Sequence, residues 1–261
     1  MKTQLRFAFL AAALCAAVLC EAQDRIIGKL FVVEVTGDTH LSSGGKVIPF
    51  KVGDTIQCKN ITIESNAESS AAGVLSNNTG LFIGPNSRFE ITRFEQAPFA
   101  ADPNRVEDEP SVSNIEGVFY SGSFAFCLAN QVFGSTAKYS MLGADVSVRG
   151  KRVVIDATDA KTTIYVVDGE VTVTTGPADQ AGTVVQSNKQ FSITPGVGGG
   201  FPIVTVADID QSVADKLSNQ ISAACLARRA VFFATPEDPR RVLAPPESPN
   251  PPTVSIDRIG N

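Results

Sequence analysis

The segment from Thr162 to Thr175, TTIYVVDGEVTVTT, constrains the fold of this chain more than any other stretch. Its apolar residues recur at every second position on either side of Asp168-Gly169. Alternation of this kind is typical of a strand with one buried face, and the Asp-Gly dipeptide favours a two-residue turn because both residues tolerate positive φ. The segment therefore predicts a β-hairpin.

Short alternating segments recur from Ile26 to Thr194, with turn signals about every eight to twelve residues, which is the pattern of an all-β domain. The composition changes between Gln96 and Ser113 to Pro, Asp, Glu and Asn. This stretch holds the acidic run Glu107-Asp108-Glu109, and we interpret it as a solvated loop that divides the strands into two halves. We predict one β domain over residues 24–207, a sandwich-like stack of short antiparallel strands.

The period changes from two to about four after residue 207. The apolar residues Ile209, Val213, Leu217, Ile221 and Cys225 form the stripe of one amphipathic helix within residues 208–234. Asp208 or Asp210 is placed to cap its start. Seven prolines follow from Pro236 onward, so residues 235–261 are predicted to be an extended and poorly ordered tail.

The first 22 residues have the pattern of a cleaved secretory signal. Lys2 and Arg6 precede an apolar run from Phe7 to Leu19, and cleavage is expected near Ala22. A membrane anchor is disfavoured because a span needs roughly 18 or more apolar residues. We therefore expect a periplasmic or secreted protein, with no transmembrane segment after cleavage.

Three of the five cysteines remain after cleavage, namely Cys58, Cys127 and Cys225. Their spacing is not that of a metal site. In an oxidising compartment Cys58 and Cys127 could pair and leave Cys225 alone. The alternative is three small buried thiols, because a free cysteine packs as a modest hydrophobe.

Six collinear motifs recur along the two halves, namely VGDTI from Val52, AAGVLSNNTG from Ala71, FIGPNSRF from Phe82, EPSVS from Glu109, GADVSVRG from Gly143 and VVDGEVTV from Val166. Read together, they resemble the FecR domain, a periplasmic β module named after a regulator that senses ferric citrate. The resemblance covers roughly Ile26 to Pro195 and implies a compact, solenoid-like stack of strands. The family-motif residues are Gly53, Asp54, Gly84, Asn86, Arg149, Gly150, Asp168, Gly169 and Glu170.

Two turns depart from the family pattern. Lys151 stands where the family usually has Thr, and Ser187-Asn188-Lys189-Gln190 replaces an alanine, glycine, glutamine corner. FecR regulators that relay signals also carry a cytoplasmic anti-sigma segment and one membrane span before the β domain. This chain is expected to have a signal peptide instead, and so to be unable to relay a signal to a sigma factor by itself.

Catalytic patterns are weak in this sequence. His40 is the single histidine, which excludes triads and zinc sites that need several His ligands, and we place it in a Gly/Ser-rich surface connection. Asp168 and Glu170 are a possible carboxylate pair, but Asp before Gly is common in turns for backbone reasons. The GVGGG run from Gly196 precedes a strand, not a helix, and so lacks the context of a phosphate loop.

The net charge of −5 and the absence of a basic cluster make nucleic acid an unlikely class of partner. We expect no enzyme activity and no cofactor. The favoured hypothesis is a secreted or periplasmic binding or sensing module that recognises a protein or polysaccharide of the cell envelope. The alternatives are a carbohydrate-active enzyme on a β-solenoid scaffold and a purely structural envelope component. The sequence leaves the ligand, the oligomeric state and a part in signalling open.

Overall fold

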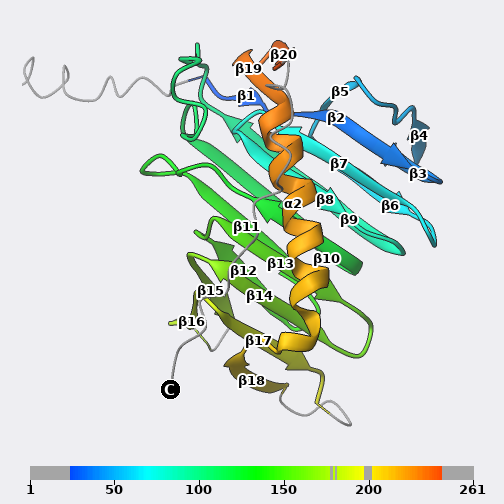
Figure 1. The fold of residues 1–261 in the computed structure, drawn as a ribbon, viewed down its shortest axis with the longest axis vertical. Coiled ribbons are helices and arrows are strands. Elements are labelled where there is room, and N and C mark those ends of the chain that lie inside the picture. Colours follow the sequence, from blue (N-terminus) through cyan, green and yellow to red (C-terminus); the bar gives the residue numbers. More distant parts are fainter. Residues whose placement is uncertain (1–23, 177–178, 180, 197–201, 243–261) are drawn as a thin grey trace, which may run out of the picture.

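The computed structural model describes residues 24–176, 179, 181–196 and 202–242. Two large β-sheets and one long helix make up this part of the chain (Figure 1). The all-β fold class with a single C-terminal helix is thus confirmed. The expected signal segment and most of the expected proline-rich tail lie outside the described residues.

Strands β1 to β18 form two sheets, named sheet A and sheet B. The hydrogen-bonded order in sheet A is β4 (Lys46–Ile48), β3 (Thr39–Ser43), β6 (Ile61–Ser65), β9 (Ser87–Gln96), β10 (Ser113–Cys127), β11 (Thr136–Met141), β12 (Ala144–Val148), β15 (Glu170–Thr174) and β16 (Thr183–Gln186), with β1 (Ile26–Ile27) on the end of β9. The order in sheet B is β5 (Thr55–Gln57), β2 (Lys29–Thr36), β7 (Ser70–Leu75), β8 (Thr79–Ile83), β10, β13 (Arg152–Ala157), β14 (Thr162–Asp168), β17 (Lys189–Thr194) and β18 (Ile203–Asp208).

The long strand β10 joins the two sheets because it belongs to both. Its first part pairs with β9 and β11 in sheet A, and its second part pairs with β8 and β13 in sheet B. From β11 onward the chain adds hairpins to sheet A and sheet B in turn, and the pairing of β10 with β11 is the single parallel one between described strands. The result is a layered stack of short strands, as the period-two pattern predicts.

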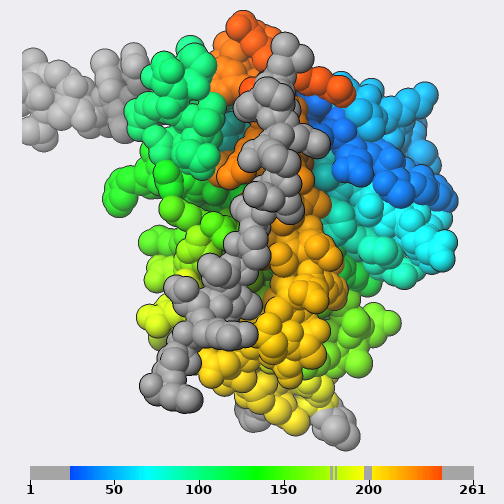
Figure 2. Space-filling view, in the orientation of Figure 1, coloured from blue at the N-terminus to red at the C-terminus, as the bar shows by residue number. Residues whose placement is uncertain are grey.

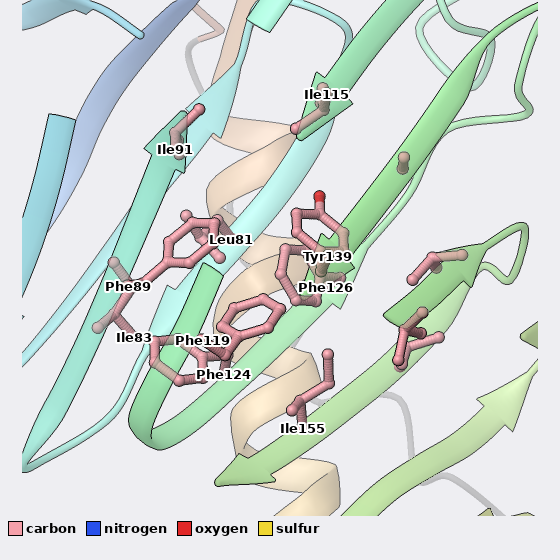
Figure 3. Close-up of a cluster of buried hydrophobic side chains, with 14 of the residues drawn as sticks. Leu81, Ile83, Phe89, Ile91, Ile115, Phe119, Phe124, Phe126, Tyr139 and Ile155 are labelled. Carbon is pink, nitrogen blue, oxygen red and sulfur yellow. The ribbon is translucent and has the colours of Figure 1, made fainter. Parts of the chain in front are cut away.

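The main core lies between the sheets and receives the inward side chains of both. Its centre is aromatic (Figure 3): the ring centroids of Phe89 and Phe119 are 4.5 Å apart, those of Phe119 and Phe124 are 4.6 Å apart, and Phe126 stacks on Tyr139 at 5.4 Å. Alternation along each strand therefore does what the sequence predicts, since it sends every second side chain into this core.

The helix α2 (Ala214–Ala230), preceded by the 3₁₀ turn η2 (Gln211–Val213), lies across the outer face of sheet B (Figures 1 and 2). Its side chains Leu217 and Ile221 pack in a second apolar cluster against β10, β13 and β14. The helix comes very close to β8, because a Cβ at Gly80 would lie 2.0 Å from the carbonyl oxygen of Ala224. The predicted stripe is confirmed. Of the two candidate caps, Asp210 accepts a 2.8 Å hydrogen bond from Ser212 N at the start of η2, whereas α2 follows Val213 and has no side-chain cap of its own.

A disulfide fixes the helix to the sheet, and it corrects the cysteine pairing considered from the sequence. Cys127, at the end of β10, is bonded to Cys225 of α2. Cys58 is a free thiol, fully buried in the main core. The possible Cys58–Cys127 pair is therefore wrong. Cys225 belongs to the apolar stripe that faces the sheet, which brings its sulfur to the strand that carries Cys127.

The end of the described chain differs from the expectation. The helix ends at Ala230, and a two-stranded hairpin follows, formed by β19 (Val231–Thr235) and β20 (Asp238–Arg241). The extended tail predicted for residues 235–261 is therefore wrong for residues 235–241, and residues 243–261 lie outside the described part of the chain. The hairpin forms because Val231 and Phe233 enter a third apolar cluster with Phe31 and Val74 on sheet B.

The segment around Asp168-Gly169 also differs from its prediction. Both strands exist, but they do not pair with each other: β14 pairs with β13 and β17 in sheet B, and β15 pairs with β12 and β16 in sheet A. Gly169 alone connects them, with φ +98°. The predicted hairpin is in fact a corner at which the chain passes from one sheet to the other.

Candidate functional site

The corners between the sheets stack on one another along one edge of the molecule. Lys151 N donates to the Asp168 carbonyl at 2.9 Å, and Arg149 N donates to the Glu170 carbonyl at 3.1 Å. Gly169 N in turn donates to Ser187 Oγ at 2.9 Å. The stacking needs glycine, because a Cβ at Gly169 would lie 2.3 Å from the Cα of Gly150. Backbone hydrogen bonds between the first two corners, and one from Gly169 N to the Ser187 side chain, thus hold three successive corners in register.

An open groove of about 1030 Å³ runs along these stacked corners. One wall is the loop that leads from β10 to β11, and the other comes from the corners before β13, β15 and β17. Its charged side chains are Arg149, Lys151 and Glu170, all exposed. Neither cation forms an ion pair within the described residues. The groove therefore offers two available positive charges to a ligand.

Phe133 is the most unusual residue of this groove. Its side chain is 101% exposed, although the loop that carries it is well anchored. Large aromatic side chains normally lose most of their surface to the core, so a fully exposed one at a groove is a candidate for contact with a ligand. The sequence does not indicate this exposure, because its pattern places Phe133 in a region of strands.

The buried carboxylate of Glu109 anchors the loop that carries Phe133. Its Oε2 accepts a 2.9 Å hydrogen bond from Val132 N, and its Oε1 accepts one of 3.3 Å from Asn77 Nδ2 and a second from Ser113 Oγ. Glu109 is 4% exposed, so the expectation of a solvated acidic run is wrong for this residue. Glu109 instead connects the β7–β8 turn, the start of β10 and the groove loop.

Burial also shifts the pKa of Glu109. Desolvation raises the pKa of its carboxyl above the ordinary range, because the charged form is disfavoured away from water. The hydrogen bonds from Ser113, Ser135 and Val132 act in the opposite direction but are the smaller effect.

The family-motif residues fall into two places. Arg149, Gly150, Asp168, Gly169 and Glu170 meet at the stacked corners beside the groove. The motif residues of the first half are not part of the groove lining.

Those first-half residues form turns of their own. Gly53 N donates to the Val32 carbonyl at 2.9 Å, and Asp54 Oδ2 accepts from Lys51 N at 2.9 Å. Gly84 N donates to the Ser123 carbonyl at 2.8 Å, and Asn86 adopts a φ of +53°. These positions have a structural role in connecting strands.

The carboxylate pair proposed from the sequence is divided by the structure. Glu170 lines the groove, whereas Asp168 lies 3.9 Å from Arg152 Nε and is not among the lining residues. His40 is on β3 and not in a loop, and its Nε2 lies 3.0 Å from Glu64 Oε2, a partner that the sequence did not indicate.

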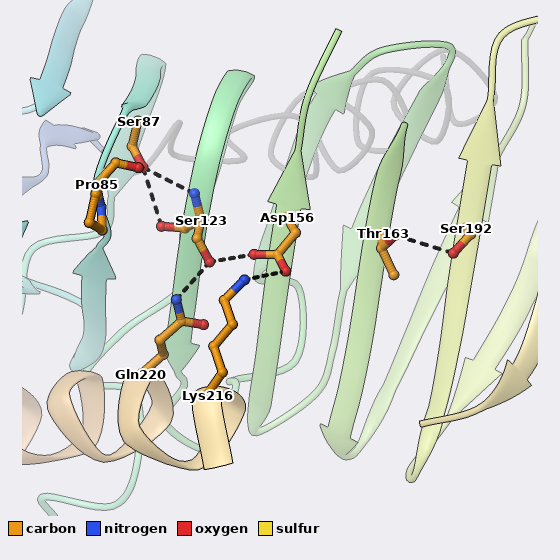
Figure 4. Close-up of polar contacts among 8 residues, drawn as sticks. All are labelled: Pro85, Ser87, Ser123, Asp156, Thr163, Ser192, Lys216 and Gln220. Carbon is orange, nitrogen blue, oxygen red and sulfur yellow. Dashed lines mark hydrogen bonds and ion pairs between the residues drawn. The ribbon is translucent and has the colours of Figure 1, made fainter. Parts of the chain in front are cut away.

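A second polar cluster lies beneath α2 (Figure 4). Ser123 Oγ donates to Asp156 Oδ1 and accepts from Gln220 Nε2 at 2.7 Å, and Lys216 Nζ lies 2.7 Å from Asp156 Oδ2. Ser123 is 9% exposed, and the helix covers it. The cluster thus joins α2 to β10 and β13, so its role is structural.

Within the described ranges, no group of three or more His, Cys, Asp or Glu side chains could hold a metal ion. No helix in the same part of the chain is long and apolar enough to cross a bilayer.

Comparison with known proteins adds a partial similarity of fold. The chain matches no family model and no curated protein. Two crystal structures of a candidate anti-sigma factor from Parabacteroides distasonis ATCC 8503 are similar to it, with TM-scores of 0.42 and 0.41 and sequence identities of 16% and 15%. Each similarity covers 59% of this chain and 62% of the other, so this chain spans less than two thirds of that protein. At this level the similarity assigns no family, and the FecR resemblance stays a prediction.

Proposed function

We propose that this protein is a non-enzymatic binding module of the periplasm or cell exterior, and that its groove binds an acidic polysaccharide of the cell envelope. The observation that carries the proposal is the fully exposed Phe133 beside Arg149 and Lys151 in one open groove. The sequence suggested a protein or a glycan as partner. The groove favours the glycan.

The chemistry of the groove fits an extended sugar chain. A volume of about 1030 Å³, open to solvent, suits several linked rings better than one enclosed small molecule. The ring of Phe133 offers a flat apolar surface to the apolar face of a sugar, and a guanidinium such as that of Arg149 binds a carboxylate through two parallel hydrogen bonds. Gln131 and Gln186 add amide groups for hydroxyls.

The groove also contains the two places where the sequence departs from the FecR pattern. Lys151 and Ser187 are both lining residues. Ser187 holds Gly169 through hydrogen bonds of 2.9 and 3.1 Å, and Lys151 brings one of the two cations. We expect the residues that give this chain its own ligand specificity to lie at such positions.

The disulfide supports a location outside the cytoplasm. Disulfides persist in oxidising compartments and are rare in the cytosol. The Cys127–Cys225 bond therefore agrees with the signal predicted for residues 1–22.

A titration of the purified mature protein tests the proposal. Isothermal calorimetry would compare alginate, a carboxylated polysaccharide, with neutral dextran, in wild type and in three variants. We expect binding to alginate alone, at least about tenfold weaker for Phe133→Ala, because an exposed aromatic at the centre of a contact is a typical hot spot. Arg149→Gln with Lys151→Gln should abolish the dependence of affinity on salt. Lys161→Gln removes an exposed cation outside the groove and should bind as wild type.

Four results would overturn the proposal. Equal binding of alginate and dextran would show that the cations play no part. Unchanged affinity of Phe133→Ala would place the ligand elsewhere. Binding of an envelope protein by the same groove, with no affinity for any carboxylated or sulfated polysaccharide, would assign the protein partner instead. Hydrolysis of the polysaccharide, lost in Glu170→Gln, would make the protein an enzyme.

A further inference from the structure

The strand β18 forms an edge of sheet B and is unusually apolar. All six of its residues are exposed, with Ile203 at 61%, Val204 at 38% and Val206 at 49%. Within the described residues its only partner is β17. In Figure 1 it lies at the lower end of the sandwich, far from β3 to β5.

Edge strands of soluble proteins usually carry devices that prevent pairing, such as short length, a lysine or an internal proline. The other sheet edges follow this rule in length: β4 and β5 have three residues each, and β16 has four. β18 has six residues, IVTVAD, with its one charge at the last position. It therefore lacks the usual protection.

The hydrogen-bond pattern shows which backbone groups of β18 point outward. Ile209 N donates to the Asn188 carbonyl at 3.2 Å, one step beyond the Asp208–Lys189 pair. Hydrogen-bonded pairs alternate along an antiparallel ladder. Ile203 and Thr205 thus turn their backbone groups toward β17, and the N–H and C=O groups of Val204, Val206 and Asp208 point away from it.

The side chains of Val204 and Val206 continue the main core. In the register with β17, Val206 is opposite Phe191 and Val204 is opposite Ile193, and both β17 residues are buried between the sheets. Directly paired residues of neighbouring strands lie on the same face. The core face of sheet B therefore extends to β18 and remains open to solvent there.

We infer that β18 is a self-association edge, at which a second copy of this chain pairs its own β18 antiparallel about a two-fold axis at Thr205. In this register Val204 is opposite Val206 of the partner subunit, so the outward backbone groups meet and the valines form one apolar strip across the axis. Ile203 is opposite Ala207 of the partner subunit. No charged pair is buried, because Asp208 lies outside the centre and stays 2.5 Å from Lys189 Nζ.

The register favours a second copy of β18 over an arbitrary strand as the partner. Val204 meets Val206 of the partner subunit and Thr205 meets Thr205 of the partner subunit, and the outward backbone groups coincide only in registers of this parity. The contact is confined to one six-residue strand from each copy, so we expect a weak dimer that forms as the protein concentration rises.

Sedimentation velocity of the full mature chain over a range of concentrations tests this inference. We expect wild type to shift from monomer to dimer, and Val206→Pro to remain a monomer at all concentrations. Proline removes an outward N–H and leaves the β17 ladder intact, as edge prolines do. Val206→Thr keeps that N–H and is the matched control, which should still dimerise.

A second variant covers the case in which Val206→Pro does not fold. Thr205→Lys places two like charges opposite each other at the axis, on side chains that are exposed in the monomer, and should abolish the dimer. A monomeric wild type at the highest concentration would refute the inference. So would a dimer that survives Thr205→Lys, or growth into open-ended assemblies. Because none of these residues lines the groove, polysaccharide binding is an independent readout.

Discussion

Removal of the Cys127–Cys225 disulfide should destabilise the protein strongly without changing its native fold. The bond closes a loop with a sequence separation of 98 residues. Loop closure of this length restricts the unfolded chain by about 16 cal/mol/K, equivalent to about 4.7 kcal/mol at 25 °C. In the native state Leu217 and Ile221 would still hold α2 on sheet B, so we expect the loss to appear in the free energy of unfolding.

Urea unfolding followed by far-UV circular dichroism measures this difference. Cys127→Ala with Cys225→Ala should lose about 3–5 kcal/mol relative to oxidised wild type, and reduced wild type should lose a similar amount. Cys58→Ala is the matched control: it removes a buried thiol but should keep the full difference between the oxidised and reduced states. A difference below about 1 kcal/mol would contradict the reasoning. Peptide mapping that finds Cys58 cross-linked to Cys127 would contradict the pairing itself.

Two further predictions concern the corners and the groove loop. Gly169→Val should lower the free energy of unfolding by about 3 kcal/mol or more, because it adds the strain of positive φ to an overlap with Gly150. Gly44→Val, at a positive φ in open space, should lower it by about 1–2 kcal/mol. Thermal unfolding of both variants measures the contrast. The free energy of unfolding should fall as the pH rises from 4.5 through the raised pKa of Glu109, because the folded state binds the carboxyl proton of Glu109 more tightly than the unfolded state does. Glu109→Gln, unfolded with urea at a series of pH values, should lack this contribution to the pH dependence of stability. A pH dependence identical to that of wild type would refute the assignment.

The sequence predicted the strands well and their partners poorly. The alternation of apolar residues from Thr162 to Thr175 predicts which side chains face inward, and these side chains do enter the core. It does not state which strand supplies the hydrogen bonds. A two-residue hairpin turn and a one-residue corner both need a glycine with positive φ, so Gly169 could not distinguish a hairpin from a passage between sheets.

The candidate site was predictable in part. The resemblance to a known family singled out Arg149, Gly150 and Glu170, and the structure brings these together beside one groove. Phe133 and Glu109 could not be found in the same way. Exposure of an aromatic side chain and burial of a carboxylate depend on how the loops between residues 97 and 135 pack on each other, which local composition does not encode.

The cysteine pairing is a similar case. Three thiols allow several connectivities, and sequence alone cannot choose among them. The choice follows from the position of α2, whose close approach at Gly80 brings Cys225 onto β10.

Hydrogen exchange with and without alginate tests the central claim most directly, because it locates the ligand on the chain. We predict slower exchange in the loop of residues 129–136 and at the corners of residues 149–151, 169–170 and 186–187, with no change at residues 53–54 or 84–86. Protection that appears at the first-half turns or along β18, with none at the stacked corners, would contradict the assignment of the groove as the binding site.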